Sequence, residues 1–471
     1  CQAAVVQSPS ATAKQFTCKV KYRSSLYQGV SHALASRYKK DRYLSKQPIM
    51  NRSFYRLFLF ALLVMYLPAS AQEPVKKKNI ILIISDDHRF DAMGIAGNKK
   101  ISTPNLDALA AAGFYFPQAT IHSPQCSPSR STLLSGQPAH RHGVFSNDII
   151  KEAKDSSRFF QQPTLPQLLQ SAGYHTFLSG KWHVPAVPWN IGFEEIRYWM
   201  PGGAGAYKDP QLAFGQTKEK KKTTGFTNEI FASEIISFLQ SPAAKEKPFF
   251  VWFSATAPHA PYRPNPKRIE NIYAGKTAKQ LLPPAFPEQY TPGNLLHYYQ
   301  AISFLDELVG RIMQTLDKTQ LSRETIIVFI GDNGLMMGSR GLKGKVNPYE
   351  ESVRVPLIIR LPQQNDSVQT ITSPVSSLDI APTLLALAGV KVPATWPGKD
   401  ISGWLEKGKK NHQDYAITEW ADNQHGYAAY RLIRTKEYKL IAWENLSKPM
   451  ELYHLVTDPH ETTNLAGKED H

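Results

Sequence analysis

The residue best placed to do chemistry is Cys126, which begins the run Cys126-Ser127-Pro128-Ser129-Arg130. Pro128 and the serine residues around it favour the start of a helix. Unpaired N–H groups and the positive end of the helix dipole meet at a helix N-terminus, and Arg130 adds a fixed cation there. The run therefore predicts an anion site at Cys126, and an ordinary cysteine nucleophile fits the same position.

Acidic and amide side chains follow two predicted strands. Asp86 and Asp87 come directly after residues 79–85, and Asp332 and Asn333 come just after residues 325–330. Carboxylates packed together repel one another and raise each other's pKa unless a cation neutralises them. Oxygen ligands select a hard ion, Ca²⁺ or Mg²⁺, over zinc. A turn or a helix cap explains either pair alone, but the two pairs together predict a metal site.

Basic side chains follow two more predicted strands. Residues 175–179 lead to Lys181 and His183, and residues 248–254 lead to His259. Ligands of open α/β sheets bind beyond the carboxyl ends of the strands. We therefore expect four strands to bring acids, an amide, a lysine and histidines to one edge of a sheet. Any one of these residues alone is explained by a solvated strand end.

The elements that must position these residues alternate between strands and helices. Continuous apolar runs predict buried strands at 79–85, 175–179, 248–254, 325–330 and 355–361. Helices are predicted at 104–113, 165–172, 227–239, 295–317 and 377–389. This alternation predicts an α/β fold, in which a large mixed, mainly parallel sheet is sandwiched by helices. The lysine-rich run 218–222 is predicted to be a solvated loop.

The chain changes character after about Gly398. Short runs at 415–420, 427–434, 438–443 and 451–455 predict strands joined by polar turns. We therefore expect a catalytic domain at 76–398 and a small antiparallel, α+β subdomain at 399–471. We expect this second part to be truncated.

The N-terminal region has the features of an export signal. Residues 50–71 contain two arginines, an apolar stretch at 57–67 and the small-residue run Ala69-Ser70-Ala71. This order is typical of a cleaved signal peptide, which leaves no membrane anchor behind. Residues 1–49 lack a clear period, and we expect them to be an upstream extension that is disordered or not translated.

Removing residues 1–71 changes the reading of charge and of cysteine. Most of the formal net charge of +16 comes from residues 1–71. The remaining chain is only mildly basic, which suits an anionic substrate and does not indicate nucleic acid. Cys1 and Cys18 also lie in the removed segment, so Cys126 is left alone and cannot form an internal disulfide.

The run CSPSRSTLLSG, residues 126–136, resembles the signature of the type I, formylglycine-dependent sulfatases of the alkaline phosphatase superfamily. Further matches follow in the family's order: Asp86-Asp87, the GKWH run ending at His183, the segment 258–262, Asp332-Asn333-Gly334, and the segment 345–350. The resemblance extends from about Asn79 to the end of the chain. It implies an exported bacterial enzyme, periplasmic or secreted, that hydrolyses sulfate esters.

The resemblance also implies a mechanism. A maturation enzyme oxidises Cys126 to formylglycine, and the hydrated aldehyde binds one Ca²⁺ together with Asp86, Asp87, Asp332 and Asn333. One hydroxyl of the hydrate attacks sulfur and the alcohol leaves; the second hydroxyl then expels sulfate. This second step explains why serine or an unmodified cysteine should work poorly.

The basic residues receive roles from the same resemblance. Arg130 and Lys181 hold the nucleophile and the sulfate oxygens, and His183 hydrogen-bonds the hydrate. His259 and Lys345 face the leaving oxygen, with His259 as the preferred general acid. Lys345 is chosen over Lys343 by its distance from Tyr349. The pair Ser339-Arg340 departs from the family, which often carries an acidic residue and a histidine there.

A sulfated carbohydrate is the expected substrate, because the exported chain is mildly basic and contains aromatic residues that can stack on sugars. The aromatic and basic candidates are Trp182, Trp189, Tyr198, Trp199, Tyr262 and Arg263, and His140, Arg141 and His142 are candidates for a sugar subsite. Three alternatives stay open: a phosphoesterase or phosphonate hydrolase of the same superfamily, a non-catalytic polyanion-binding module, and a cysteine-thiol hydrolase.

Overall fold

A computed structural model describes residues 77–149, 158–283, 292–362, 368–405, 414–421 and 428–468. The expected signal peptide and upstream extension, residues 1–71, lie outside the described residues. Within the described ranges, no helix is long and apolar enough to cross a membrane. Residues from Val75 to the C-terminus form one compact unit, and the description below concerns this unit.

The centre of this unit is a ten-stranded sheet whose order is β11-β2-β10-β9-β1-β8-β4-β5-β6-β7. Its parallel core consists of β9 (Thr325–Gly331), β1 (Asn79–Ser85), β8 (Phe249–Ser254), β4 (His175–Lys181) and β5 (Glu195–Met200). Ser85 pairs with Gly331, so β1 and β9 end level with each other. This register brings the residues that follow the two strands to the same point of the sheet edge.

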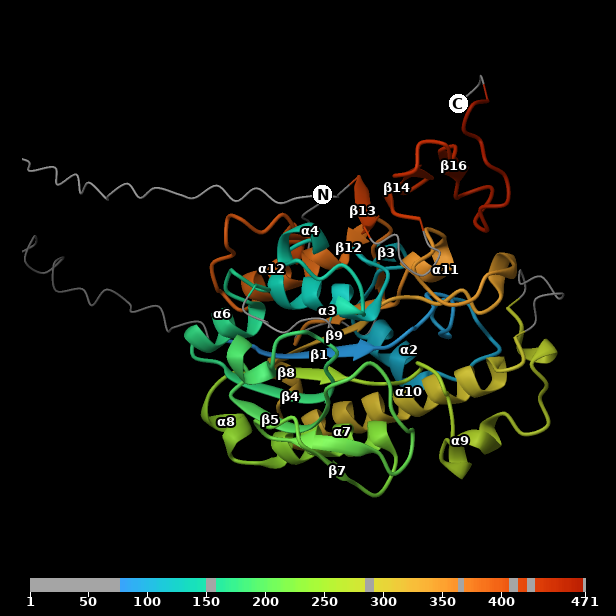
Figure 1. The fold of residues 1–471 in the computed structure, drawn as a ribbon. Coiled ribbons are helices and arrows are strands. Elements are labelled where there is room, and N and C mark those ends of the chain that lie inside the picture. Colours follow the sequence, from blue (N-terminus) through green and yellow to red (C-terminus); the bar gives the residue numbers. More distant parts are fainter. Residues whose placement is uncertain are drawn as a thin grey trace, which may run out of the picture. The chain divides into compact units, whose positions relative to one another are not determined.

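Helices cover both faces of the sheet, as Figure 1 shows. One face packs on α2 (Pro104–Ala111), α7 (Thr227–Gln240) and α10 (Leu295–Lys318), and the other on α3 (Cys126–Ser135), α6 (Leu165–Ser171) and α12 (Ile380–Leu387). Alternate residues of β1 divide between the layers: Ile81 and Ile83 enter one core, and Leu82 enters the other. The continuous apolar run of β1 is thus explained by burial on both faces, and the predicted α/β fold class is confirmed.

Antiparallel pairs occur on both sides of the parallel core. On one side β10 (Leu357–Arg360) pairs antiparallel with β9, next to the short strands β2 (Phe114–Tyr115) and β11 (Gln369–Thr370). On the other side β5 pairs antiparallel with β6 (Gln211–Phe214), which pairs with β7 (Lys220–Lys222). The lysine-rich run was therefore predicted wrongly as a loop, because its last three residues form the edge strand. Exposed lysines on an edge strand discourage pairing with another chain.

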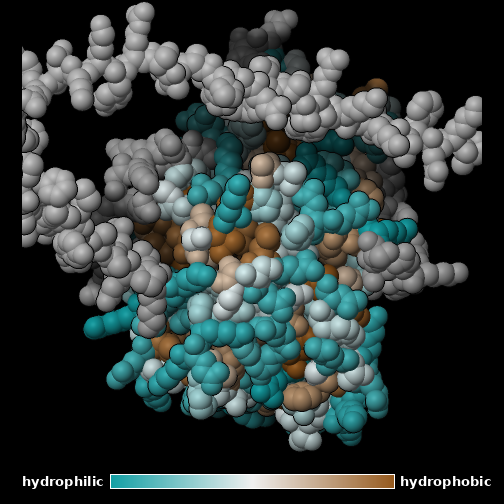
Figure 2. Space-filling model, turned by 90° about the vertical axis from the view of Figure 1, so that its left-hand side faces the viewer, coloured by the Kyte–Doolittle hydropathy of each residue, from teal (hydrophilic) through white to brown (hydrophobic). Residues whose placement is uncertain are grey.

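A separate antiparallel sheet ends the chain, as expected. It contains β13 (Tyr415–Trp420), β14 (Tyr430–Thr435), β15 (Tyr438–Trp443) and β16 (Glu451–His454). The other strands within the described ranges are β3 (Ala119–Thr120) and β12 (Val375–Ser376), and the other short helices there are α4 (Ala139–His142), α8 (Ala243–Glu246), α9 (Lys267–Ile272), α11 (Glu350–Val353) and α13 (Ser402–Leu405). Single 3-10 turns occur at Pro188–Ile191, Lys279–Leu281, Ser322–Glu324, Ser339–Gly341 and Ser377–Asp379. On the face shown in Figure 2, hydrophilic side chains cover most of the lower half, and hydrophobic ones gather near the centre.

Candidate active site

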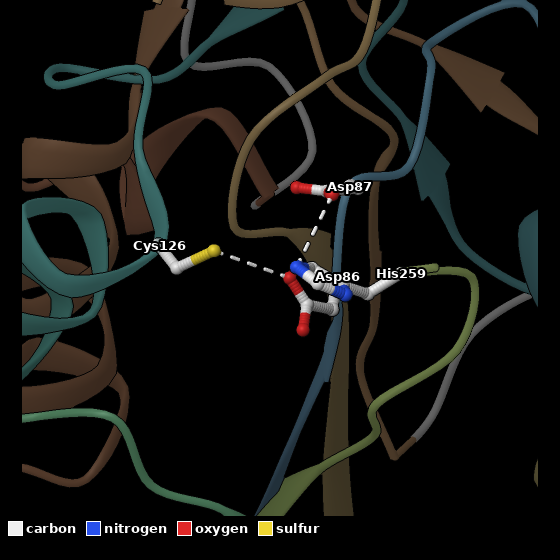
Figure 3. A group of neighbouring side chains, drawn as sticks. All are labelled: Asp86, Asp87, Cys126 and His259. Atoms are coloured by element: carbon white, nitrogen blue, oxygen red, sulfur yellow. Dashed lines mark hydrogen bonds and ion pairs between the residues drawn. The ribbon is translucent and has the colours of Figure 1, made fainter. Parts of the chain in front are cut away.

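The expected site residues converge beyond the carboxyl ends of the parallel strands. Asp86 and Asp87 follow β1, Asp332 and Asn333 follow β9, and Lys181 is the last residue of β4. Cys126 is the first residue of α3, and its side chain points toward the two aspartates in Figure 3. This convergence arises because β1 and β9 end at the same height in the sheet. The backbone N–H of Asp332, just after β9, donates to the carbonyl of Ser85, the last residue of β1, at 2.8 Å.

Cys126 is completely buried and surrounded by charged groups. Its Sγ lies 3.3 Å from Oδ1 of Asp86, 3.5 Å from Nζ of Lys181 and 2.8 Å from Nζ of Lys345. Burial first, and Asp86 second, raise the pKa of the thiol to about 12, although the two lysines oppose this shift. These surroundings do not produce a thiolate, so they do not favour an ordinary cysteine nucleophile.

The oxygen cluster fits a hard cation. The Oδ1 of Asn333 is buried and has no hydrogen-bond partner, whereas its Nδ2 donates to Oδ1 of Asp87 at 2.7 Å. Ligand atoms of Asp86, Asp87, Cys126 and His259 all lie within 4.8 Å of one another. An unpaired amide oxygen among carboxylates is the donor set that calcium and magnesium prefer.

Two buried cations hold the carboxylates in place. The guanidinium of Arg130 contacts Oδ2 of Asp332 at 2.8 Å and donates to the carbonyl of Lys181 at 2.9 Å. The ammonium of Lys181 pairs directly with Asp86. Burial opposes ionisation of Asp86, but Lys181 and the other cations keep its pKa far below the usual range. Each buried charge thus has an opposite partner, which buried ions require.

The two histidines have different surroundings. His183 has a positive φ of 52°, and its Nδ1 is buried without a hydrogen-bond partner. Burial first, and then Lys181, lower its pKa to about 2, so the imidazole is neutral. His259 is more open, with 22% of its side chain exposed, and its Nε2 lies 3.7 Å from Oδ2 of Asp87. It is therefore the histidine that a ligand arriving from solvent can reach.

A cavity of about 730 Å³ opens next to these residues. Asp87, His259 and Lys345 form its inner wall, and Tyr262, Asn294, Leu335 and Met337 form other parts of its lining. Of these, Asn294, Leu335 and Met337 were not singled out in the sequence, which offers no motif around them. Lys343 also lines the cavity, but its side chain is exposed and Lys345 alone of the two contacts Cys126.

The family assignment follows from a comparison of the chain with protein-family models. The model of the sulfatase family matches residues 78–390, which contain every expected site residue. The chain belongs to the sulfatase family. A second model, described as N-sulphoglucosamine sulphohydrolase, C-terminal, matches residues 338–471 of this sulfatase. The chain is accordingly a sulfuric ester hydrolase of the alkaline phosphatase superfamily.

Several known sulfatases are similar to this one over most of its length. An ulvan-active sulfatase of Formosa agariphila is 27% identical over 85% of this chain and 79% of its own length. An N-acetylglucosamine-6-O-sulfatase of Bacteroides thetaiotaomicron is 27% identical over 85% of this chain and 84% of its own. A structure solved with its substrate D-glucosamine-2-N,6-O-disulfate superposes with a TM-score of 0.71 at 26% identity, covering 84% and 94% of the two chains.

Several residues of the sulfatase that were expected to contact a sugar are buried in the structure. Trp182 and Trp199 are 2% and 1% exposed and pack in the core, so neither can stack on a sugar. His142 is buried with its Nε2 3.2 Å from Oγ1 of Thr132. The spacing of these residues along the chain does not show that their side chains are buried. Their burial depends on the elements that pack against them in the folded structure, such as the neighbours of β4 and β5 in the sheet.

The departure at Ser339-Arg340 has a structural explanation. The guanidinium of Arg340 lies 3.9 Å from the ring centre of Tyr349 and donates to the carbonyls of His460 and Glu461. The hydroxyl of Ser339 accepts a hydrogen bond of 3.0 Å from Nη1 of Arg89. In this sulfatase the two residues connect the loop after β9 to the C-terminal segment and to Arg89.

Proposed function

We propose that this sulfatase removes sulfate groups from a sulfated carbohydrate, with Cys126 oxidised to formylglycine as the nucleophile. The observation that supports this most strongly is the convergence of Asp86, Lys181 and Lys345 on the Sγ atom of Cys126. Two ammonium groups and one carboxylate around a single buried atom suit a nucleophile that acts on an anion. A maturation enzyme is the partner that this modification requires.

The metal in this proposal is one calcium ion held by Asp86, Asp87, Asp332 and Asn333, with the modified Cys126 as the further ligand. The unpartnered Oδ1 of Asn333 supports the assignment, because a buried acceptor without a donor is costly unless a cation or water satisfies it. When bound, calcium polarises the sulfate group and offsets the negative charge that develops on it.

The roles proposed for the remaining residues follow from their positions. Lys181 and Lys345 lie against Cys126, where their ammonium groups offset the charge of a bound sulfate. Arg130 is fixed by Asp332 and by the Lys181 carbonyl, and it keeps both in place. His183 has a buried Nδ1 without a partner, which can accept a hydrogen bond from the hydrated nucleophile.

His259 is the proposed acid for the leaving group. It lines the cavity and is partly exposed, whereas His183 is enclosed. Its Nδ1 lies 2.8 Å from the carbonyl of Ala260, so a proton on Nδ1 is donated to that carbonyl in a hydrogen bond. The Nε2 atom then faces the site, and in the doubly protonated imidazolium it can donate its proton to the alcohol oxygen as the S–O bond breaks, leaving the neutral ring.

A carbohydrate substrate is supported by the relatives and by the cavity. The similar proteins include an ulvan-active sulfatase and an N-acetylglucosamine-6-O-sulfatase. Here the cavity of about 730 Å³ is in the range of small-molecule sites. Tyr262 lines it, but only 8% of this residue is exposed. Export to the periplasm or medium, as residues 50–71 predict, would place the enzyme where such glycans occur.

The test begins with the chain from Gln72, produced with and without a formylglycine-generating enzyme. We expect the tryptic peptide containing Cys126 to show the aldehyde mass only after coexpression. The same sample should release sulfate from an aryl sulfate and from a panel of sulfated sugars. Matched samples of Cys126→Ser and Cys126→Ala should lose this activity.

Other outcomes decide between the alternatives. An unmodified Cys126 together with full hydrolysis by the serine variant contradicts the formylglycine proposal. Faster turnover of phosphate monoesters or phosphonates than of any sulfate ester favours the phosphoesterase alternative. Binding of sulfated sugars with no turnover by the modified protein favours the non-catalytic module.

A further inference from the structure

A second cavity, of about 410 Å³, shares no lining residue with the cavity at Cys126. Its walls come from α4, from β13 and from the turn before α12, and His122 and Glu419 both line it. Its volume falls within the range of small-molecule sites. Among the residues that line it, Arg141, Lys399 and Arg431 carry positive charge.

The two acidic residues of this cavity are already satisfied by neighbouring groups. The carboxylate of Glu419 lies 3.2 Å from Nε2 of His122 and 3.0 Å from Nδ1 of His140. The carboxylate of Asp379 accepts backbone N–H bonds from Ser376 at 2.9 Å and from Lys399 at 2.8 Å. The three cations outnumber the two carboxylates, so the lining keeps an excess of positive charge.

The three cations, in contrast, keep their charged ends exposed. Arg431 has 78% of its side chain exposed, and its nearest carboxylate contact, with Glu419, is 4.0 Å long. Lys399 is exposed, and its Nζ lies 5.5 Å from the ring centre of Tyr415. Arg141 is exposed and donates from Nη1 to the carbonyl of Thr395 at 2.9 Å. In the described ranges, no carboxylate forms an ion pair with Lys399 or Arg141.

We propose that this cavity binds an anionic sugar unit of a sulfated oligosaccharide, distinct from the unit that is cleaved at Cys126. The three exposed cations complement sulfate groups, and the ring of Tyr415, which is 43% exposed, offers a stacking surface for a sugar. The cavity is also far larger than a single sulfate ion needs. The choice of ligand rests on the proposed function, whereas the charge and shape of the cavity do not.

The position of the second cavity suits a substrate longer than one sugar. His122 lies four residues before Cys126, so their Cα atoms are at most about 14 Å apart. Helix α4, which supplies Arg141, follows α3, which begins with Cys126. The segment that contains Cys126 therefore leads from the active site to the second cavity, and an oligosaccharide of a few sugar rings is long enough to span this distance.

The test compares two triple variants of the full mature enzyme. Arg141→Ala/Lys399→Ala/Arg431→Ala removes the three cations of the cavity. Lys220→Ala/Lys221→Ala/Lys222→Ala removes the same charge from the exposed edge strand β7. Binding of a heparin-derived hexasaccharide and of ulvan and carrageenan hexasaccharides is measured by calorimetry in a Cys126→Ala background, and kcat/KM for an aryl sulfate is measured with Cys126 present and modified.

We expect the cavity variant to bind its best hexasaccharide about tenfold more weakly, as the loss of three exposed charge contacts implies. Its kcat/KM for the aryl sulfate and its melting temperature should stay unchanged, and Tyr415→Ala should weaken binding without changing charge. Equal losses in the two triple variants, no loss in the cavity variant, or no binding of any hexasaccharide by the parent protein overturns the proposal. Displacement of the hexasaccharide by equimolar inorganic sulfate also overturns it, because the cavity is then a simple anion site.

These experiments distinguish a failure of the second site from a failure of the proposed function. If the enzyme fails to hydrolyse the aryl sulfate but the cavity variant still binds more weakly than the control, the proposed function fails and the second site stands. If hydrolysis is intact and the two triple variants bind alike, the second site fails and the proposed function stands.

Discussion

The Nζ atom of Lys345 lies 2.8 Å from the Sγ atom of Cys126, although 219 residues separate them in the chain. The same ammonium group lies 2.6 Å from Oδ1 of Asp87. Lys343, two residues earlier, lines the cavity next to the active site and makes neither of these contacts. The structure thus distinguishes two lysines of the same loop by their distance from the nucleophile.

Replacing Lys345 with methionine should lower kcat/KM for an aryl sulfate by about 10²- to 10³-fold, the usual effect of losing one charged group that stabilises the transition state. Lys343→Met is the matched control, and we expect its kcat/KM to change by less than about threefold because a surface charge contributes little. Initial rates with a modified Cys126 in each variant provide the measurement. Equal losses in the two variants would contradict the assignment of Lys345.

Calcium should stabilise the protein through Asn333. A ligand at 100 times its Kd raises the free energy of unfolding by about 2.7 kcal/mol, so calcium added after chelation should raise the melting temperature. In Asn333→Ala the amide oxygen that the structure leaves unpartnered is gone, and the calcium-dependent rise should shrink. Differential scanning calorimetry measures both proteins with and without calcium. An identical rise in the two proteins would exclude Asn333 as a ligand.

The stability of the fold should depend on pH through Asp306 of helix α10. This residue is 1% exposed and accepts the backbone N–H of Leu106, at the start of α2, at 2.7 Å. Burial raises its pKa from 3.8 to about 6, although the N–H donors of Asn105 and Leu106 oppose the shift. The folded state therefore binds the proton more tightly than the unfolded state between pH 4 and 6, and stability falls as the pH rises through this window.

The variant Asp306→Asn isolates this effect, because it cannot ionise. The free energy of unfolding of the parent protein should fall relative to that of the variant between pH 4 and 6, by up to about 3 kcal/mol. Above pH 6 the difference should be constant. Melting temperatures of the two proteins from pH 4 to 7 provide the comparison, and a constant difference across the whole range would show that Asp306 does not titrate as inferred.

A buried ion cluster should hold the C-terminal sheet in place. Glu350, the first residue of α11, lies 3.0 Å from Nη2 of Arg434 on β14 and 3.0 Å from Nζ of Lys439 on β15. Glu350→Ala leaves two buried cations with fewer partners and should destabilise the protein by about 3–5 kcal/mol. Exposed Glu437, in the turn between β14 and β15, is the control. Similar melting temperatures for Glu350→Ala and Glu437→Ala would contradict a structural role of the cluster.

Most of the fold could be predicted from local patterns. The strands β1, β8 and β9 carry continuous apolar runs because they are buried on both faces, and β13 and β15 have the bounds that their runs predicted. The direction of β10 and the edge strand β7 could not be predicted, because pairing of strands depends on partners far away in the chain.

The sequence by itself indicated a metal site and an anion site, because acids and an amide follow the strands and Cys126 begins a helix. The reaction was indicated by the resemblance of residues 126–136 to the sulfatase signature. The sequence also determined that Asp86 and Asp332 would meet, since parallel strands end at one edge. Only the tertiary structure decided that Lys345 rather than Lys343 reaches Cys126, that Oδ1 of Asn333 is left without a partner, and that Trp182 is buried. These outcomes depend on register and packing between distant segments, which residue types and spacing along one chain do not specify.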